Sequence, residues 1–166
     1  MIGICGGSGY IGSALYEYLI SKGENVMGTY CKNKKPGLIK YDLRTTSFTM
    51  FSQCSYVIIT SAYKVKFCEE NAIEAHFLNV YRTKGLLEYL DGQNIPAFFI
   101  SSAIAVKPDT KYGKYKAEVE RFIRIHRLKA RFNRPGPVKV NEETIKPLCE
   151  EIYNDYQSGR REKVTA

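Results

Sequence analysis

MIGICGGSGYIG, residues 1–12, is the stretch of sequence that decides the fold. Its first four residues form a short apolar run typical of a buried strand, and Gly6, Gly9 and Gly12 then follow at intervals of three. A helix is predicted directly after them, because apolar residues recur at helical spacing as far as Gly23, a residue type that commonly ends a helix. A glycine loop between a strand and a helix is typical of a unit that binds a dinucleotide.

Glycine has a physical purpose in such a loop. It permits the tight turn, lets the backbone approach a pyrophosphate, and lets the helix pack closely on the strand. The helix N-terminus adds amide N–H groups and a partial positive charge. We therefore predict that a nicotinamide dinucleotide binds here, and a glycine turn in some other α/β fold is the alternative. The contacts predicted from this loop are Gly6, Ser8, Gly9, Tyr10, Ile11 and Gly12.

Strands and helices are predicted to alternate along the rest of the chain. This alternation predicts an α/β protein with a three-layer Rossmann fold, in which a doubly wound parallel sheet has its ligand crevice at the carboxyl ends of the strands. One domain is expected over residues 1–166, with its core in 1–138 and its strongest break at Pro135-Gly136-Pro137. After the first strand, the predicted strands are 25–29, 39–43, 56–60, 97–101 and 129–133, the later helices are 68–89, 112–127 and 142–156, and a frayed tail runs from 158.

Composition excludes several classes of protein. The five cysteines are odd in number without CxxC spacing, and only two histidines are present, so neither a disulfide framework nor a metal site is expected. No apolar run approaches the length of a membrane span and no signal peptide is recognisable, so a cytoplasmic protein without a membrane partner is expected. The formal charge is +8, with denser basic stretches at 32–35 and 121–134. No nucleic-acid-binding motif accompanies either stretch, which favours a solvated basic surface over a nucleic-acid partner.

The end of the second predicted strand indicates which cofactor binds. An NAD site usually has an acidic residue there for the ribose hydroxyls, but residues 28–35 contain none. Lysines in this stretch suit a 2′-phosphate, which favours NADP(H) and leaves NAD(H) possible; a solvated loop is the alternative. Asp42 is a candidate neighbour of the adenine or a cap of the next segment. The further candidate cofactor contacts are Tyr30, Lys32, Lys34, Lys35, Asp42, Leu43, Ser61 and Ala62.

Tyr112 and Lys116 are the candidate catalytic pair. They are four residues apart on a predicted helix and hence share one face, where the lysine is expected to lower the pKa of the tyrosine. A tyrosine of this kind passes a proton to or from a carbonyl or alcohol oxygen. Ser101 and Ser102 end the fifth predicted strand, where a hydroxyl can hold that same oxygen. Since the chain contains 13 tyrosines, a surface ladder on the helix is the alternative.

Taken in this order, the motifs resemble the short-chain dehydrogenase/reductase family, in particular its extended branch of NAD-dependent epimerases and dehydratases. The stretch 5–12 resembles the TGxxGxxG loop of the family with Cys5 in place of threonine, and 134–136 (RPG) resembles its segment after the sixth strand. The run from Val65 to Asn79 is similar to that of the dTDP-4-dehydrorhamnose reductase subgroup. The other matching stretches are NVYRTKGLLE at 79–88, FISS at 99–102 and YGKYKAE at 112–118.

The resemblance implies a role for each catalytic candidate. Tyr112 is implied as the general acid, with Lys116 lowering its pKa and holding the nicotinamide ribose. Ser101 or Ser102 is implied to orient the substrate oxygen, and Asn79 to support a proton-relay water. The implied function is an NADP(H)-dependent reductase or epimerase that transfers hydride to a nucleotide keto-sugar or related carbonyl. A non-enzymatic NADP(H)-binding regulatory or scaffold protein is the alternative.

The sequence departs from the family pattern on the substrate side. Only nine residues separate Ser102 from Tyr112, where extended members have a longer loop. The C-terminal substrate lobe is reduced to about one helix within 139–166, and Lys66 stands where the subgroup has aspartate. The sugar-nucleotide substrate is therefore implied by analogy alone. Pairing of family members through the helices at 68–89 and 112–127 implies a homodimer.

Overall fold

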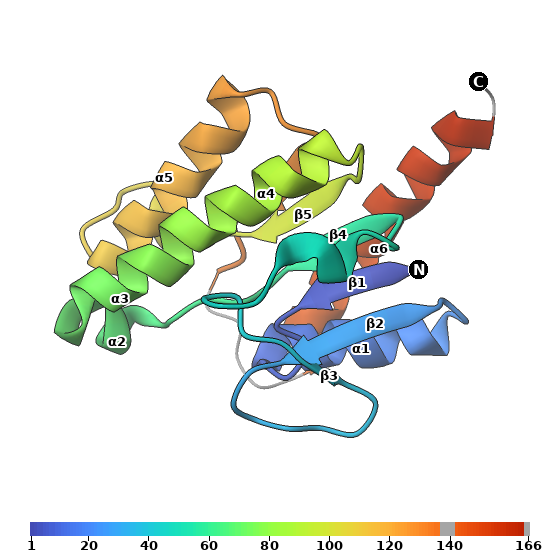
Figure 1. The fold of residues 1–166 in the computed structure, drawn as a ribbon, viewed down its shortest axis with the longest axis horizontal. Coiled ribbons are helices and arrows are strands. Elements are labelled where there is room, and N and C mark those ends of the chain that lie inside the picture. The colour runs from blue at the N-terminus through green and yellow to red at the C-terminus, as the bar shows by residue number, and fades with distance from the viewer. Residues whose placement is uncertain (137–141, 165–166) are drawn as a thin grey trace.

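A computed structural model describes residues 1–136 and 142–164 and shows a six-stranded parallel sheet (Figure 1). The strand order is β3-β2-β1-β4-β5-β6, so the chain winds outward in both directions from β1 and β4. This confirms the predicted doubly wound Rossmann architecture, whose ligand crevice lies where the strand order reverses. The strands are β1 Ile2–Cys5, β2 Val26–Tyr30, β3 Ile39–Lys40, β4 Tyr56–Ile59, β5 Ala97–Ile100 and β6 Ala130–Asn133.

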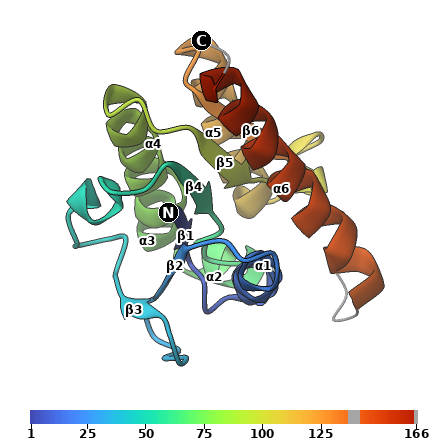
Figure 2. The ribbon, with the colours of Figure 1, turned by 90° about the vertical axis from the view of Figure 1, so that its right-hand side faces the viewer.

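Helices α1 (Tyr10–Ser21) and α6 (Glu142–Val164) cover one face of the sheet (Figure 2). Ile145, Leu148 and Ile152 of α6 are buried in one cluster with residues of β1, β4, β5 and α1. The segment that the sequence assigned to a remnant of the substrate lobe therefore contributes to the core of the Rossmann domain. The helix also continues to Val164, past the predicted end at 156 and through the tail that was expected to fray.

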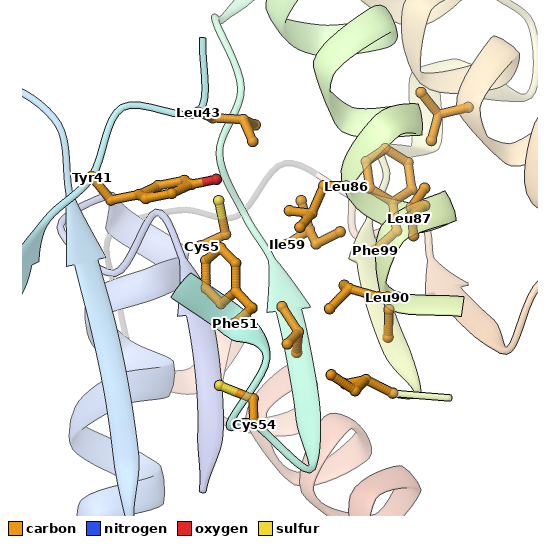
Figure 3. Packing of buried hydrophobic residues seen from close by; sticks show 14 of the residues in the cluster. Cys5, Tyr41, Leu43, Phe51, Cys54, Ile59, Leu86, Leu87, Leu90 and Phe99 are labelled. Atoms are coloured by element: carbon orange, nitrogen blue, oxygen red, sulfur yellow. The ribbon is translucent and has the colours of Figure 1, made fainter. Parts of the chain in front are cut away.

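The opposite face is covered by a series of shorter helices together with α5 (Lys111–Ile125). Side chains from β1, β4, β5 and α4 pack into one cluster there, in which Cys5, Phe51, Ile59 and Phe99 are buried (Figure 3). These buried strands are apolar on both faces, as expected for a parallel sheet between two helical layers. The shorter elements are the 3-10 turns η1 Phe48–Phe51 and η3 Ala103–Ala105, and the helical segments α2 Val65–Glu70, α3 Ala72–His76, η2 Phe77–Arg82 and α4 Thr83–Gly92.

Two elements differ from the sequence-based expectation. The single helix predicted at 68–89 is interrupted, because the backbone of Asn71 leaves the helical region (φ −131°, ψ 58°) and η2 is a π-helix with a wider turn. The third strand ends at Lys40 and not at residue 43, because Asp42 turns the chain by accepting hydrogen bonds from the amides of Thr45 and Thr46. Both irregular segments line or support the site described next.

Candidate active site

The glycine loop packs closely against β1, β2 and the residues that follow β4. Gly6 has φ +99°, and a Cβ atom there would lie 2.7 Å from the hydroxyls of Thr60 and Ser61. A Cβ at Gly12 would lie 2.1 Å from the carbonyl oxygen of Gly6, so only glycine fits at either position. The amide of Gly6 donates to the Thr29 hydroxyl (3.1 Å), which donates to the carbonyl of Ile4 (3.2 Å). The loop is thus preformed, and α1 begins at Tyr10 after the N-cap residue Gly9, which provides no side-chain cap.

A pocket of about 230 Å³ lies above this loop at the carboxyl edge of the sheet. It brings together eight of the predicted cofactor contacts: Gly6, Ser8, Gly9, Lys32, Asp42, Leu43, Ser61 and Ala62. Eight others do not line it: Tyr10, Ile11, Gly12, Tyr30, Lys34, Lys35 and the two residues Tyr112 and Lys116, which were also expected to contact the cofactor. Lys35 instead donates to the Ser13 hydroxyl on α1 (2.8 Å). Sequence reasoning missed the remaining lining residues Thr29, Cys31, Asn33, Tyr41, Arg44, Thr60, Tyr63 and Leu78.

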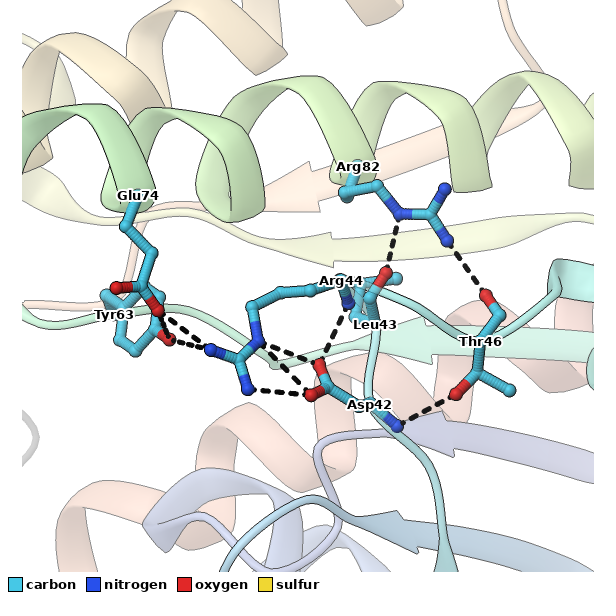
Figure 4. Close-up of polar contacts among 7 residues, drawn as sticks. All are labelled: Asp42, Leu43, Arg44, Thr46, Tyr63, Glu74 and Arg82. Atoms are coloured by element: carbon cyan, nitrogen blue, oxygen red, sulfur yellow. Dashed lines mark hydrogen bonds and ion pairs between the residues drawn. The ribbon is translucent and has the colours of Figure 1, made fainter.

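Arg44 is the most connected of the missed residues (Figure 4). Its guanidinium forks onto Asp42, with Nε 3.0 Å from Oδ1 and Nη2 2.7 Å from Oδ2, and its Nη1 donates to Glu74 (2.8 Å) and to the Tyr63 hydroxyl (3.0 Å). The Arg44 hydrogen bond holds the pKa of Asp42 at about 2. The arginine charge is therefore matched by two carboxylates, whereas Lys32 forms no ion pair within the described residues. An arginine two residues beyond Asp42 was visible in the sequence, but its partner on α3 was not.

A second arginine fixes the same loop from the neighbouring helix. Arg82, in η2, donates from Nε to the carbonyl of Leu43 (2.6 Å) and from Nη2 to that of Thr46 (2.8 Å) (Figure 4). Both acceptors are backbone carbonyls, so Arg82 fixes the main chain of the loop at residues 43–46. Asp42 and Leu43 are thereby positioned beside the pocket before any ligand binds.

The structure brings Tyr112 and Lys116 together at the end of β5. Thr110 caps α5 by accepting from the amide of Gly113 (3.1 Å). Lys116 is buried, and its Nζ donates to the carbonyl of Ile100 (2.7 Å) while lying 5.6 Å from the centroid of the Tyr112 ring. A Cβ at Gly113 would lie 2.9 Å from the carbonyl oxygen of Ile104, so η3 packs directly on the first turn of α5.

Burial dominates the titration of the catalytic pair. It raises the pKa of Tyr112 to about 12, with a smaller contribution from Cys68. It lowers the pKa of Lys116 to about 7, against the opposing effects of Cys68 and Glu120. The expected lowering of the Tyr112 pKa by Lys116 is not seen in this structure, where burial of the phenol is the largest effect and Lys116 is itself desolvated. Tyr112 keeps its proton at neutral pH.

The two serines at the end of β5 have different surroundings. Ser101 is buried, and its hydroxyl donates to Glu120 (2.5 Å) on α5. Ser102 is half-buried and precedes η3. Ser102 is therefore the hydroxyl better placed to meet a ligand, while Ser101 is committed to the protein interior.

The Asn79 side chain, also buried, binds the segment that follows β4. Its Oδ1 accepts from the amide of Tyr63 (2.8 Å), and its Nδ2 donates to the carbonyl of Tyr63 (2.9 Å) and to the thiol of Cys68 (3.3 Å). The amide is thus engaged on both its ends. Its implied part in a proton relay stays a prediction.

Two kinds of feature are missing from the described residues. No group of three or more His, Cys, Asp or Glu side chains there is arranged to hold a metal ion. None of the helices in the described ranges is long and apolar enough to cross a membrane.

Comparison with solved structures supports the fold. Similar chains include a hypothetical dTDP-4-dehydrorhamnose reductase from Sulfolobus tokodaii (20% identity, TM-score 0.72, 85% of this chain and 57% of that one). They also include a UDP-glucose 4-epimerase of Thermus thermophilus in complex with NAD (21% identity, TM-score 0.69, 79% and 52%). A further UDP-glucose 4-epimerase is 24% identical (TM-score 0.69, 79% and 49%). The chain spans about half the length of these proteins.

Comparison with curated protein sequences gives no significant match. The profile of the NAD dependent epimerase/dehydratase family, in contrast, matches residues 2–129, which include the glycine loop, Asn79 and the Tyr112–Lys116 pair. The match covers most of the chain. This chain belongs to the NAD dependent epimerase/dehydratase family.

Proposed function

We propose that this chain is an NADP(H)-dependent reductase of the short-chain dehydrogenase/reductase type, with Tyr112 as its proton donor. The observation that carries the proposal is the pairing of Tyr112 with Lys116 at the carboxyl end of β5, on the sheet edge that also bears the glycine loop. Acid–base chemistry and dinucleotide binding thereby meet at one edge of one sheet.

The pocket suits a dinucleotide in its backbone and its charge. Gly6 and Gly9 offer a bare backbone and Ser8 a hydroxyl just before α1, whose first turn carries no acidic residue. Lys32 is the cation proposed to meet a 2′-phosphate, since Arg44 is neutralised by Asp42 and Glu74. This assignment supports NADP(H) over NAD(H), with Lys32 as the discriminating residue in place of Lys34 and Lys35.

The protein residues supply the proton and the orientation in this proposal. A bound nicotinamide ring supplies or accepts a hydride. Tyr112 is protonated at neutral pH, so its hydroxyl can donate a proton to the carbonyl oxygen of the substrate as the hydride reaches the carbonyl carbon. Ser102 donates a hydrogen bond to the same oxygen. Lys116, packed beneath the Tyr112 ring, places a cationic side chain near the phenolate that remains after proton transfer.

The proposed substrate is a nucleotide keto-sugar or a related carbonyl compound. This proposal is supported by the structural similarity of the chain to a UDP-glucose 4-epimerase and to a hypothetical dTDP-4-dehydrorhamnose reductase. Epimerisation of a nucleotide sugar uses the same groups and is the closest variant of the proposal.

Cofactor choice is tested by titrating NADPH and NADH into wild type, Lys32→Ala and Lys34→Ala, following the reduced nicotinamide fluorescence. Lys32→Ala is expected to weaken the binding of NADPH by about tenfold, which is the effect of losing roughly one charged hydrogen bond. The affinity for NADH should not change. Lys34→Ala, the control from the same loop, should change neither. Equal weakening of both cofactors by Lys32→Ala would remove the basis for NADP(H).

Catalysis is tested with a panel of nucleotide keto-sugars and NADPH, using wild type and Tyr112→Phe. Wild type should oxidise NADPH in the presence of at least one substrate, and Tyr112→Phe should lose that activity while binding NADPH normally. Failure of wild type to bind either dinucleotide would refute the whole proposal.

A second function, NADP(H) binding without catalysis, is favoured by one specific observation. The pocket above the glycine loop is lined by none of Ser102, Tyr112 and Lys116, so the proposed cofactor site and the acid–base residues do not share it. A regulatory or scaffold protein of this kind would bind NADPH tightly yet reduce no member of the substrate panel.

A further inference from the structure

Glu120 is a buried carboxylate that joins three segments around the candidate active site. It lies on α5 one turn beyond Lys116 and is 2% exposed. Its Oε1 accepts from the Ser101 hydroxyl (2.5 Å), and Arg134 forks onto it with Nε 2.9 Å from Oε1 and Nη2 2.6 Å from Oε2. A carboxylate this deeply buried is stable only when paired and hydrogen-bonded, so the three side chains form one unit.

The unit is reinforced by backbone hydrogen bonds from the end of β6. The amide of Ser101 donates to the carbonyl of Asn133 (2.8 Å), and that of Ala103 donates to the carbonyl of Pro135 (3.1 Å). In sequence, Ser102 lies between the two donor residues and Arg134 lies between the two acceptor residues. The end of β6 and the start of η3 are thereby locked together on either side of the candidate substrate-binding hydroxyl.

Lys116 is attached to the same segment. Its Nζ donates to the carbonyl of Ile100, the residue that directly precedes Ser101. Glu120 also acts on Lys116 through its charge, because a nearby carboxylate favours the ammonium form against the effect of burial. The other titratable or charged groups around this pair are Cys68 from α2, Tyr112 and Arg124 from α5, and Arg134 from the segment after β6.

We infer that Glu120 is a positioning residue of the proposed reductase site: bound to Ser101 and Arg134, it holds Ser102 and the Lys116 ammonium in place beside Tyr112. The expected effect on turnover rests on the proposed function. The Glu120 carboxylate touches neither substrate nor cofactor in this role and acts through Ser101 and Lys116. Its loss is expected to slow turnover far more than it weakens cofactor binding.

The test separates the charge of Glu120 from its hydrogen bonds. Glu120→Gln keeps the shape and an acceptor for Ser101 but removes the charge, and Ser101→Ala removes the hydroxyl but keeps the charge. Arg134→Lys keeps the cation but loses the fork, and it is the milder variant in case Glu120→Gln does not fold. Glu118→Gln is the matched control, because Glu118 is a more exposed carboxylate on the same helix that pairs with Lys84 and His76.

Each variant is measured for NADPH affinity, for kcat and KM with the best keto substrate, for melting temperature, and for the pKa of Lys116 by NMR of ¹³C-labelled lysine. Glu120→Gln is expected to bind NADPH within about twofold of wild type and to lower kcat by at least about tenfold, since small misplacements of reacting groups cost that much or more. The pKa of Lys116 should fall below its wild-type value. Ser101→Ala and Arg134→Lys should lower kcat with a smaller change in that pKa.

The inference is overturned if Glu120→Gln leaves both kcat and the Lys116 pKa at wild-type values, or if Glu118→Gln changes them equally. Failure of the proposed function has a different signature, namely no turnover by wild type on any substrate. In that case the NMR titration still decides whether Glu120 controls Lys116, because it needs no activity.

Discussion

Replacing Lys116 with methionine tests the central electrostatic feature of the candidate site. The side chain is 3% exposed, and burial lowers its pKa from 10.5 to about 7. In the unfolded chain the lysine keeps its ordinary pKa. Between about pH 7 and pH 10 the unfolded state therefore binds more protons than the folded state, and wild-type stability at this site rises with pH. Methionine has a similar volume and no charge, so Lys116→Met lacks this dependence.

The size of the effect follows from the two pKa values. One pKa unit corresponds to about 1.4 kcal/mol, so the depression of the Lys116 pKa costs the folded state roughly 4 kcal/mol at neutral pH. Raising the pH from about 7 to about 9 relieves roughly 2 kcal/mol of this cost, whereas lowering it from about 7 to about 5 changes it by less than about 0.5 kcal/mol. The difference in unfolding free energy between Lys116→Met and wild type should therefore be nearly constant in acid. In mild alkali wild type should gain about 2 kcal/mol relative to Lys116→Met.

Urea unfolding followed by circular dichroism at three pH values measures this difference directly, since the chain contains no tryptophan to report by fluorescence. Lys114→Met, at an exposed lysine of the same helix, is the control for losing one positive charge. The buried cysteines other than Cys68 titrate alike in both proteins and cancel in the comparison, whereas Lys116 itself lowers the pKa of Cys68. Stability curves of wild type and Lys116→Met that run parallel from pH 5 to pH 9 would refute the reasoning, because they would show that Lys116 is as easily charged in the fold as in water.

Three other substitutions test the fold and the pocket. Gly12→Ala places a Cβ atom 2.1 Å from the carbonyl oxygen of Gly6, so it should abolish NADPH binding and lower the melting temperature, and a variant that binds normally would contradict the structure of the loop. Ile152→Ala, at a fully buried position of α6, should cost about 2–5 kcal/mol of unfolding free energy in urea, whereas a loss below about 0.5 kcal/mol would mean that α6 is not part of the core. Asp42→Asn removes a carboxylate whose pKa Arg44 holds at about 2, so the stability it supplies is present above about pH 4 and is lost as the pH falls toward 2. The stability gap between this variant and wild type should accordingly close in acid, and a gap independent of pH would contradict the Asp42–Arg44 pair.

The order of strands and helices was predictable because each element follows from a local pattern of residues. The run before Gly6, the β-branched stretch of β4 and the apolar spacing of α5 each depend on a few adjacent residues, and each element is observed close to its predicted range. The break at Asn71 was not predictable from periodicity, because apolar residues continue at helical spacing on both sides of it. The packing of α6 on the sheet was not predictable for a related reason, since an amphipathic pattern does not reveal which surface a helix packs on.

The polar contacts of the site were hidden because they join residues far apart in sequence. Arg44 meets Glu74 from a different element, and Ser101 meets Glu120 across the sheet edge. Spacing along a helix did reveal that Tyr112 and Lys116 share a face, but it carried no information on burial. Burial is the largest effect on both groups, since it raises the pKa of Tyr112 and lowers that of Lys116, whose Nζ donates to the carbonyl of Ile100.

Hydrogen-bond partners in the structure also limit the roles that the family resemblance implies for Asn79 and Ser101. Asn79 has both ends of its amide bound to the backbone of Tyr63, so its most direct effect is on a residue that lines the pocket above the glycine loop. Ser101 is likewise committed to Glu120, which leaves Ser102 for a ligand. If these two assignments hold, Asn79→Ala should weaken NADPH binding and Ser102→Ala should lower kcat at unchanged affinity. The opposite pattern, with Asn79→Ala affecting only turnover, would instead support the proton-relay role that the resemblance implies.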